Sequence, residues 1–147
     1  MRERRSAGPI QILLVDDNPA DAQLVERALG TTRVKIRLSV VPDGFEALNY
    51  VRRQGSYADA SRPDLILLDL NLPGKDGYEV LRELRGDPEF REIPVLIYTG
   101  SATRSDVKLA YALGGNCYVQ KPTNLDELMD IASSIESFWL CTALLPW

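Results

Sequence analysis

Short apolar runs recur along this chain, and a longer amphipathic segment separates each run from the next. The runs at residues 10–15, 65–68 and 94–98 are almost uninterrupted by polar residues. Such runs are typical of parallel strands that are buried on both faces. Residues 36–40 alternate between apolar and polar positions, and residues 117–120 form a further short run. The pattern predicts five strands.

An amphipathic helix is predicted after each strand. The first begins at Asn18-Pro19, because proline is favoured at the first helical position, and its apolar stripe ends at Leu29 before a glycine. A polar residue that can cap a helix also stands before the second helix, at Asp43. The five helices are predicted at residues 19–29, from the Asp43-Gly44 start through Val51, after the turn at 71–77, at about 104–113 and at about 125–140.

Strands that alternate with helices indicate right-handed crossovers, a parallel sheet and helices on both faces. The predicted fold class is therefore α/β, doubly wound. In such sheets, ligands bind at the carboxyl ends of the strands. The chain has no glycine-rich dinucleotide or nucleotide-binding loop, which argues against those cofactors.

Composition narrows the function classes. The chain has 147 residues, enough for one domain, and its net charge of −4 argues against nonspecific binding to nucleic acid or anionic membranes. No apolar stretch approaches the ~20 residues of a membrane span, and no signal segment is recognised, so the protein is expected to be cytoplasmic. The sequence contains no histidine, which excludes histidine-based triads and histidine zinc sites.

Acidic residues follow two of the predicted strands directly. Asp16-Asp17 comes after the first run and Asp69 after the third, so three carboxylates are expected to meet at one edge of the sheet. Their mutual repulsion favours a hard divalent cation between them, and Mg²⁺ fits best because it binds carboxylates and phosphate oxygens. Thr99 and Lys121 follow the fourth and fifth strands. With Asp69 as nucleophile, this set predicts a site that accepts a phosphoryl group.

Four motifs together resemble the receiver domain of two-component response regulators. Thr99 lies 30 residues and Lys121 lies 52 residues after Asp69, as in that family. The resemblance covers about Ile10 to Leu140 and implies the flavodoxin-like receiver fold, with strand order 2-1-3-4-5. The motifs are Val15-Asp16-Asp17-Asn18, residues 68–77 (Leu-Asp-Leu-Asn-Leu-Pro-Gly-Lys-Asp-Gly), Tyr98-Thr99-Gly100-Ser101 and residues 118–122 (Tyr-Val-Gln-Lys-Pro).

The resemblance implies a role for each matching residue. Asp69 is the phosphoacceptor, and Lys121 and Thr99 contact the phosphoryl group. Thr99 and Tyr118 form a switch pair that converts the local charge into a change of surface. The implied ligands of Mg²⁺, for which Mn²⁺ can substitute, are Asp69, Asp17 directly, Asp16 mainly through water, and Asn71 through its backbone carbonyl.

Two sequence features depart from the simplest members of that family. The interval between Asp17 and Asp69 is longer, with a polar loop at residues 54–61, which is expected to change a surface and not the site. Ser101 stands where some relatives have an acidic or amide residue that orients water. Pro122, in contrast, agrees with the family: the resemblance implies a cis peptide bond after Lys121, a form that only proline adopts readily.

The C-terminal segment indicates the type of regulator. Residues 1–9 are expected to be a flexible tail, residues 10–140 the receiver domain, and residues 141–147 a C-terminal tail too short for an output domain. The ending resembles response regulators paired with bacterial and cyanobacterial phytochromes, so the implied partner is a sensor histidine kinase, such as a bacteriophytochrome. Phe138, Trp139 and Leu140 are predicted to form a homodimer interface, because they extend beyond the helical face that covers the sheet.

Two other function classes compete with this interpretation. A phosphatase of the haloacid dehalogenase type also uses Mg²⁺ and an aspartyl nucleophile, but its nucleophile lies in an Asp-x-Asp motif on the first strand, whereas Asp16 and Asp17 are adjacent. A docking module that acts without phosphorylation would not need all five site residues. The sequence therefore favours a phosphoacceptor signalling protein over a conventional enzyme. Acetyl phosphate labelling separates the three classes.

Overall fold

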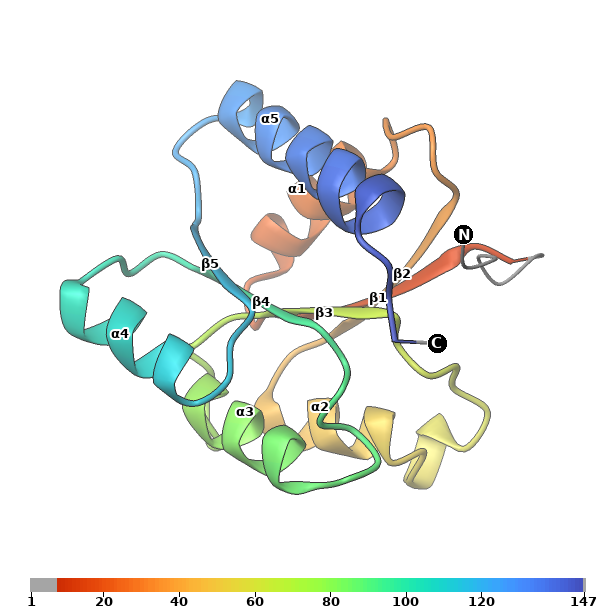
Figure 1. Ribbon diagram of the computed structural model, residues 1–147, viewed down its shortest axis with the longest axis vertical. Coiled ribbons are helices and arrows are strands. Elements are labelled where there is room, and N and C mark those ends of the chain that lie inside the picture. The colour runs from red at the N-terminus through yellow and green to blue at the C-terminus, as the bar shows by residue number, and fades with distance from the viewer. Residues whose placement is uncertain (1–7, 147) are drawn as a thin grey trace.

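The computed structural model describes residues 8–146, so the predictions for residues 1–7 and Trp147 lie outside the described residues. Five parallel strands form a single sheet in the order β2-β1-β3-β4-β5 (Figure 1). This confirms the predicted fold class and strand order. The strands are β1 (Ile10–Val15), β2 (Ile36–Val41), β3 (Leu65–Leu68), β4 (Val95–Thr99) and β5 (Cys117–Gln120).

Five α-helices cover the two faces of the sheet. α1 and α5 lie on one face, and α2, α3 and α4 lie on the other (Figure 1). A side-chain oxygen caps each helix at its N-terminus and accepts a backbone N–H that has no partner within the helix. The helices are α1 (Pro19–Leu29), α2 (Gly44–Val51), α3 (Gly77–Gly86), α4 (Arg104–Ala112) and α5 (Leu125–Ile135).

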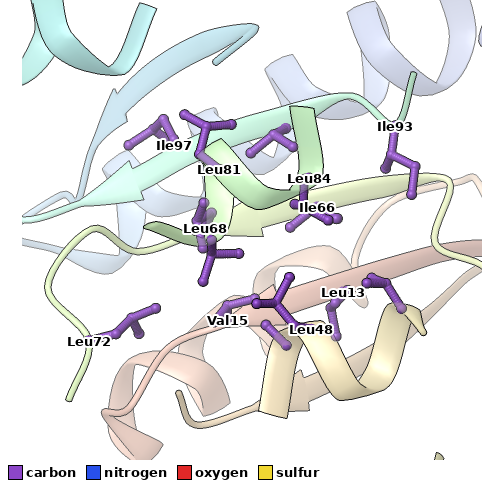
Figure 2. Close-up of a cluster of buried hydrophobic side chains, with 14 of the residues drawn as sticks. Leu13, Val15, Leu48, Ile66, Leu68, Leu72, Leu81, Leu84, Ile93 and Ile97 are labelled. Carbon is purple, nitrogen blue, oxygen red and sulfur yellow. The ribbon is translucent and has the colours of Figure 1, made fainter. Parts of the chain in front are cut away.

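The three central strands separate two hydrophobic clusters. Alternate residues point to opposite faces, so Leu13 and Ile66 pack toward α2 and α3 (Figure 2), whereas Ile12 and Leu67 pack toward α1 and α5. Because β1, β3 and β4 are buried on both faces, their register is fixed by packing as well as by backbone hydrogen bonds. The carboxyl ends of these strands are therefore rigid supports for a site.

The C-terminal segment differs from the prediction of one long helix. α5 ends at Ile135, and the chain continues as a π-helix, η2 (Glu136–Thr142). Leu140 is only 1% exposed and Trp139 packs partly against the α1 and α5 cluster, whereas Phe138 is 54% exposed. The prediction that Leu140 lies on an exposed dimer surface is therefore wrong, because the wider π turn directs this side chain into the core of its own chain.

The polar loop at residues 54–61 is partly ordered by local contacts. It contains a short 3-10 helix, η1 (Gly55–Tyr57), and the Tyr57 hydroxyl donates a hydrogen bond to Glu46 on α2. The rings of Tyr50 and Tyr57 lie 5.3 Å apart. Among residues 8–146, no helix is long and apolar enough to cross a membrane.

Candidate functional site

The carboxyl edge of the sheet brings together all five of the predicted reactive side chains. The sheet hydrogen bonds continue past the strand ends: the Asp69 amide donates to Val15 at 3.0 Å and the Lys121 amide donates to Thr99 at 2.7 Å. Oxygens of Asp16, Asp17 and Asp69 lie within 4.8 Å of one another. We call Asp16, Asp17, Asp69 and Lys121 the acidic pocket.

Gly77 allows the helix after Asp69 to begin against the pocket. A Cβ atom at this position would lie 2.3 Å from the Asp69 carbonyl oxygen and 2.6 Å from the Leu70 Cα. Such distances are well inside van der Waals contact, so only glycine fits without moving the backbone. The Gly77 amide also donates to the Leu70 carbonyl at 3.0 Å. The start of α3 and the loop that carries Asp69 therefore form one packed unit.

Both oxygens of the Asp69 side chain accept hydrogen bonds. Oδ1 accepts from the Thr99 hydroxyl at 2.8 Å and from the Asn71 amide at 3.0 Å, and Oδ2 accepts from Lys121 Nζ at 2.8 Å. Thr99 is fully buried, with 0% of its surface exposed. These donors orient the carboxylate and stabilise its negative charge. The predicted phosphoacceptor, lysine and threonine are thus in direct contact.

Lys121 contacts a third carboxylate that was not among the predicted site residues. Its Nζ lies 2.9 Å from Asp16 Oδ2 and 3.0 Å from Asp21 Oδ2. Burial lowers the pKa of the Lys121 ammonium, but its close contacts with the carboxylates of Asp69, Asp16 and Asp21 outweigh burial and raise the pKa overall. Asp21 lies in the first turn of α1. The sequence signal that could have identified Asp21 is its position in the first turn of the helix predicted at residues 19–29, directly after the strand that leads to Asp16 and Asp17.

Asp16 offers a buried oxygen that is suited to a cation. The side chain is 2% exposed, and its Oδ1 accepts the Asn18 amide at 2.9 Å. Oδ2 forms the ion pair with Lys121 but lacks a hydrogen bond from the described residues. Desolvation by burial raises the pKa of Asp16. A divalent cation bound to this oxygen and to exposed Asp17 would satisfy both carboxylates, so the residues fit Mg²⁺ or Mn²⁺.

The peptide bond between Lys121 and Pro122 is trans, because residues 8–146 contain no cis peptide bond. The predicted cis proline is therefore wrong for this structure. Trans is the lower-energy form of an X-Pro bond by about 0.5–1 kcal/mol. The hydrogen bond of the Lys121 amide to Thr99 already aligns the lysine with the end of β4.

The predicted switch residues lie beside a second carboxylate. The Tyr118 ring is half-buried against the cluster under α3 and α4, and its hydroxyl donates to the Ser101 carbonyl at 2.7 Å. The Ser101 hydroxyl donates to Asp106 on α4 at 2.5 Å. Asp106 was not predicted as a site residue. The available signal was a Thr103-x-x-Asp106 spacing, which resembles a helix capping pattern.

The arrangement has the parts that phosphoryl transfer requires. Asp69 is a carboxylate nucleophile, Lys121 and Thr99 are donors for phosphoryl oxygens, and Asp16 and Asp17 are ligands for a metal. No second nucleophile is needed for a covalent acyl phosphate to form. The geometry therefore supports a site that is itself modified.

Comparison with known proteins agrees with this chemistry. The response regulator receiver domain family matches residues 12–133. Response regulator Rcp1 from Synechocystis sp. is 46% identical over 138 residues, covering 94% of each protein. The phosphorylated cyanobacterial phytochrome response regulator RcpA has a similar structure, with a TM-score of 0.90, 48% identity and coverage of 95% of this chain and 100% of RcpA. The Mn²⁺-bound form of Rcp1 gives a TM-score of 0.88, 45% identity and coverage of 95% and 100%.

Proposed function

The chain belongs to the response regulator receiver domain family, and from this membership we propose that Asp69 accepts a phosphoryl group in signal transduction. The observation that carries the proposal is the set of contacts at Asp69. Its two oxygens accept hydrogen bonds from Thr99 and Lys121, and two further carboxylates lie within 4.8 Å. The site therefore combines a nucleophile, hydrogen-bond donors for the phosphoryl oxygens, and metal ligands.

In the proposed reaction, an Asp69 oxygen attacks the phosphorus of a phosphohistidine in line with the leaving nitrogen. The P–N bond breaks, its electron pair remains on the imidazole, and a P–O bond to Asp69 forms. Lys121 and Thr99 donate to the phosphoryl oxygens. Asp16, Asp17, Asp69 and the Asn71 carbonyl would hold Mg²⁺ or Mn²⁺, which neutralises charge on the transferring group. Later attack of water on the phosphorus breaks the P–O bond to Asp69, which restores the carboxylate and releases inorganic phosphate.

Phosphorylation is proposed to act outward through Thr99 and Tyr118. A phosphoryl group on Asp69 replaces the carboxylate as the acceptor for the Thr99 hydroxyl, and the Tyr118 ring, whose hydroxyl here contacts the Ser101 carbonyl, adjusts to it. The two residues belong to β4 and β5. A local change in charge would thus alter the surface formed by α4 and β5.

The phosphoryl donor is proposed to be a sensor histidine kinase, since this sequence has no histidine of its own. A phytochrome kinase is the proposed type, because RcpA is described as a phytochrome response regulator. Leu24 on α1 is 42% exposed, and α1 begins beside the acidic pocket. We propose that the kinase docks on this side of α1.

A homodimer is also proposed, with Phe138 and the exposed part of Trp139 as its candidate interface, because Phe138 is exposed and Trp139 is only partly buried. The substitution Phe138→Glu should shift a dimer toward monomer in analytical ultracentrifugation. Phe45→Glu is the matched control, because Phe45 on α2 is 56% exposed, like Phe138 at 54%, but lies on the opposite face of the sheet. A wild-type protein that sediments as a monomer at tens of micromolar, with or without beryllofluoride, would contradict the dimer.

The phosphoacceptor proposal is tested by incubation with Mg²⁺ and acetyl phosphate, followed by mass spectrometry of the intact protein. Wild type should gain one phosphoryl group, and Asp69→Asn should gain none while it melts within a few degrees of wild type. The fold should persist because the substitution removes one charge from a group of carboxylates that repel one another. Labelling of Asp69→Asn at the wild-type rate would show that another residue is the acceptor.

A further inference from the structure

Asp106 lies at the centre of a hydrogen-bond cluster that joins α3, α4 and the loop between β4 and α4. Its Oδ1 accepts from the Tyr78 hydroxyl at 2.5 Å, and its Oδ2 accepts from the Ser101 hydroxyl at 2.5 Å and from the Thr103 hydroxyl at 2.7 Å. We call Tyr78, Ser101, Thr103 and Asp106 the Asp106 cluster. Three neutral donors converge on this one carboxylate.

Helix capping explains only part of this cluster. The Thr103 hydroxyl accepts the Asp106 amide at 3.2 Å, which caps α4. Neither the Tyr78 hydroxyl nor the Ser101 hydroxyl contributes to that cap. Their contacts instead connect α3 to the loop that follows Thr99. The additional contacts therefore call for a role other than capping the start of α4.

The cluster connects the Thr99 loop to the Asp69 loop by a second route. The first route is the direct hydrogen bond between Thr99 and Asp69. The second runs from Ser101 through Asp106 to Tyr78, and Tyr78 follows Gly77, which packs against the Asp69 backbone. Both loops are thus connected to the start of α3, so two separate sets of contacts fix their relative position.

We propose that Asp106 is a positioning residue: with Tyr78 it holds Ser101, and through Ser101 it keeps the Thr99 hydroxyl placed toward Asp69. The inference rests on the proposed phosphoacceptor function and adds to it a residue that does not touch the phosphoryl group. The Tyr118 hydroxyl binds the Ser101 carbonyl, so Ser101 is held from both sides. The Asp106 cluster therefore sets how readily the loop after Thr99 leaves its place.

The expected loss of ligand affinity follows from the fraction of molecules that are in the binding-competent conformation. The Thr99–Asp69 contact and the Asp106 cluster are present together in this structure, so each stabilises the conformation that contains the other. When a variant lowers the fraction of molecules in the binding-competent conformation, the apparent affinity falls by the same factor. Ligands that require Thr99 should be weakened, while ligands that need only the carboxylates should not.

The test is calorimetric titration of the full chain with beryllofluoride, a phosphoryl mimic, in saturating Mg²⁺. Tyr78→Phe removes one hydroxyl and keeps the ring, and it should weaken beryllofluoride binding about three- to tenfold. Asp106→Asn should weaken it at least as much. Tyr111→Phe is the matched control, because Tyr111 is an exposed tyrosine on α4, and it should bind as wild type does.

Two measurements separate positioning from a merely structural effect. The Mg²⁺ affinity of Tyr78→Phe, measured without beryllofluoride, should equal that of wild type, because Asp16 and Asp17 do not depend on the cluster. In a Thr99→Ala background, the added Tyr78→Phe substitution should have no further effect on beryllofluoride binding. A full additional loss in that background, or a parallel loss of Mg²⁺ affinity, would overturn the proposed role.

The outcomes also separate this inference from the function on which it rests. Wild type that does not bind beryllofluoride would contradict the phosphoacceptor proposal and this inference with it. Wild type that binds beryllofluoride while Tyr78→Phe binds equally or more tightly would overturn only the role of Asp106.

Discussion

The acidic pocket and the Asp106 cluster lie at the same edge of the sheet, but they shift the pKa of a carboxyl group in opposite directions. Burial raises the pKa of Asp16 in the pocket. Hydrogen bonds from Ser101, Tyr78 and Thr103 lower the pKa of Asp106 to about 2. The first environment disfavours charge and the second favours it.

The difference indicates a division of tasks between the two regions. The Lys121 ammonium group contacts three carboxylates, those of Asp16 and Asp69 in the pocket and that of the neighbouring Asp21, and Asp17 lies beside Asp16 and Asp69. In the proposed function, a cation would balance the negative charge of the pocket, and a phosphoryl group on Asp69 would then change it. The Asp106 cluster pairs one carboxylate with neutral hydroxyls, so metal binding in the pocket should not change its contribution to stability. One region responds to ligands and the other holds the loops that surround the response.

The largest effect is expected from Gly77→Ala, which should damage both regions at once. The new Cβ would meet the Asp69 carbonyl at 2.3 Å, and the adjacent Tyr78 would move with the helix start. We expect a loss of about 3 kcal/mol in the free energy of unfolding, together with weaker Mg²⁺ binding. Urea denaturation and metal titration measure the two effects.

Gly86→Ala is the control for that substitution. Gly86 ends the same helix, and nothing lies within 4 Å of a Cβ placed there. Because alanine favours the helix over glycine by up to ~1 kcal/mol, this variant should be as stable as wild type or slightly more stable. Equal destabilisation by both substitutions would show that close packing at Asp69 is not the cause.

The acidic pocket could be predicted from the sequence because topology alone assembles it. Asp16, Asp69 and Lys121 each follow a strand directly, Thr99 is the last residue of β4, and parallel strands present their carboxyl ends at one edge. Their contacts therefore do not depend on details of side-chain packing. Once the strands and their order were assigned, the distances followed from the register of the sheet.

The Asp106 cluster and the C-terminal π-helix could not be predicted in the same way. The contact between Tyr78 and Asp106 depends on how α3 and α4 approach each other and on the side-chain conformations of both residues. The burial of Leu140 depends on a change of helical period, which the apolar pattern of an α-helix does not encode. The trans bond at Pro122 was also missed, since residue type permits both isomers.

The second prediction compares how much Mg²⁺ stabilises variants of the two regions. Mg²⁺ at one hundred times its dissociation constant should stabilise wild type by about 2.7 kcal/mol, because it binds only the folded chain. Asp17→Asn should lose most of this gain, since Asp17 is one of the proposed metal ligands. Asp106→Asn should keep the gain in full. Thermal melts with and without Mg²⁺ measure it, and a loss in Asp106→Asn equal to that in Asp17→Asn would show that the two regions are not independent.

The smallest effect is a pH dependence that should have opposite signs in the two regions. The pKa of Asp106 falls from its usual 3.8 to about 2 on folding, so its stabilising contribution is complete above pH 3.8 and is lost as the pH falls toward 2. The raised pKa of Asp16 acts in reverse, because its unfavourable contribution at neutral pH disappears on acidification. Asp106 is only partly buried on its helix, so solvent screens the effect and keeps it small. We therefore expect wild type to exceed Asp106→Asn in urea midpoint at pH 6, and the two midpoints to converge between pH 3.8 and 2. A difference that stays constant over this range would mean that Asp106 stabilises the fold through its shape and not through its charge.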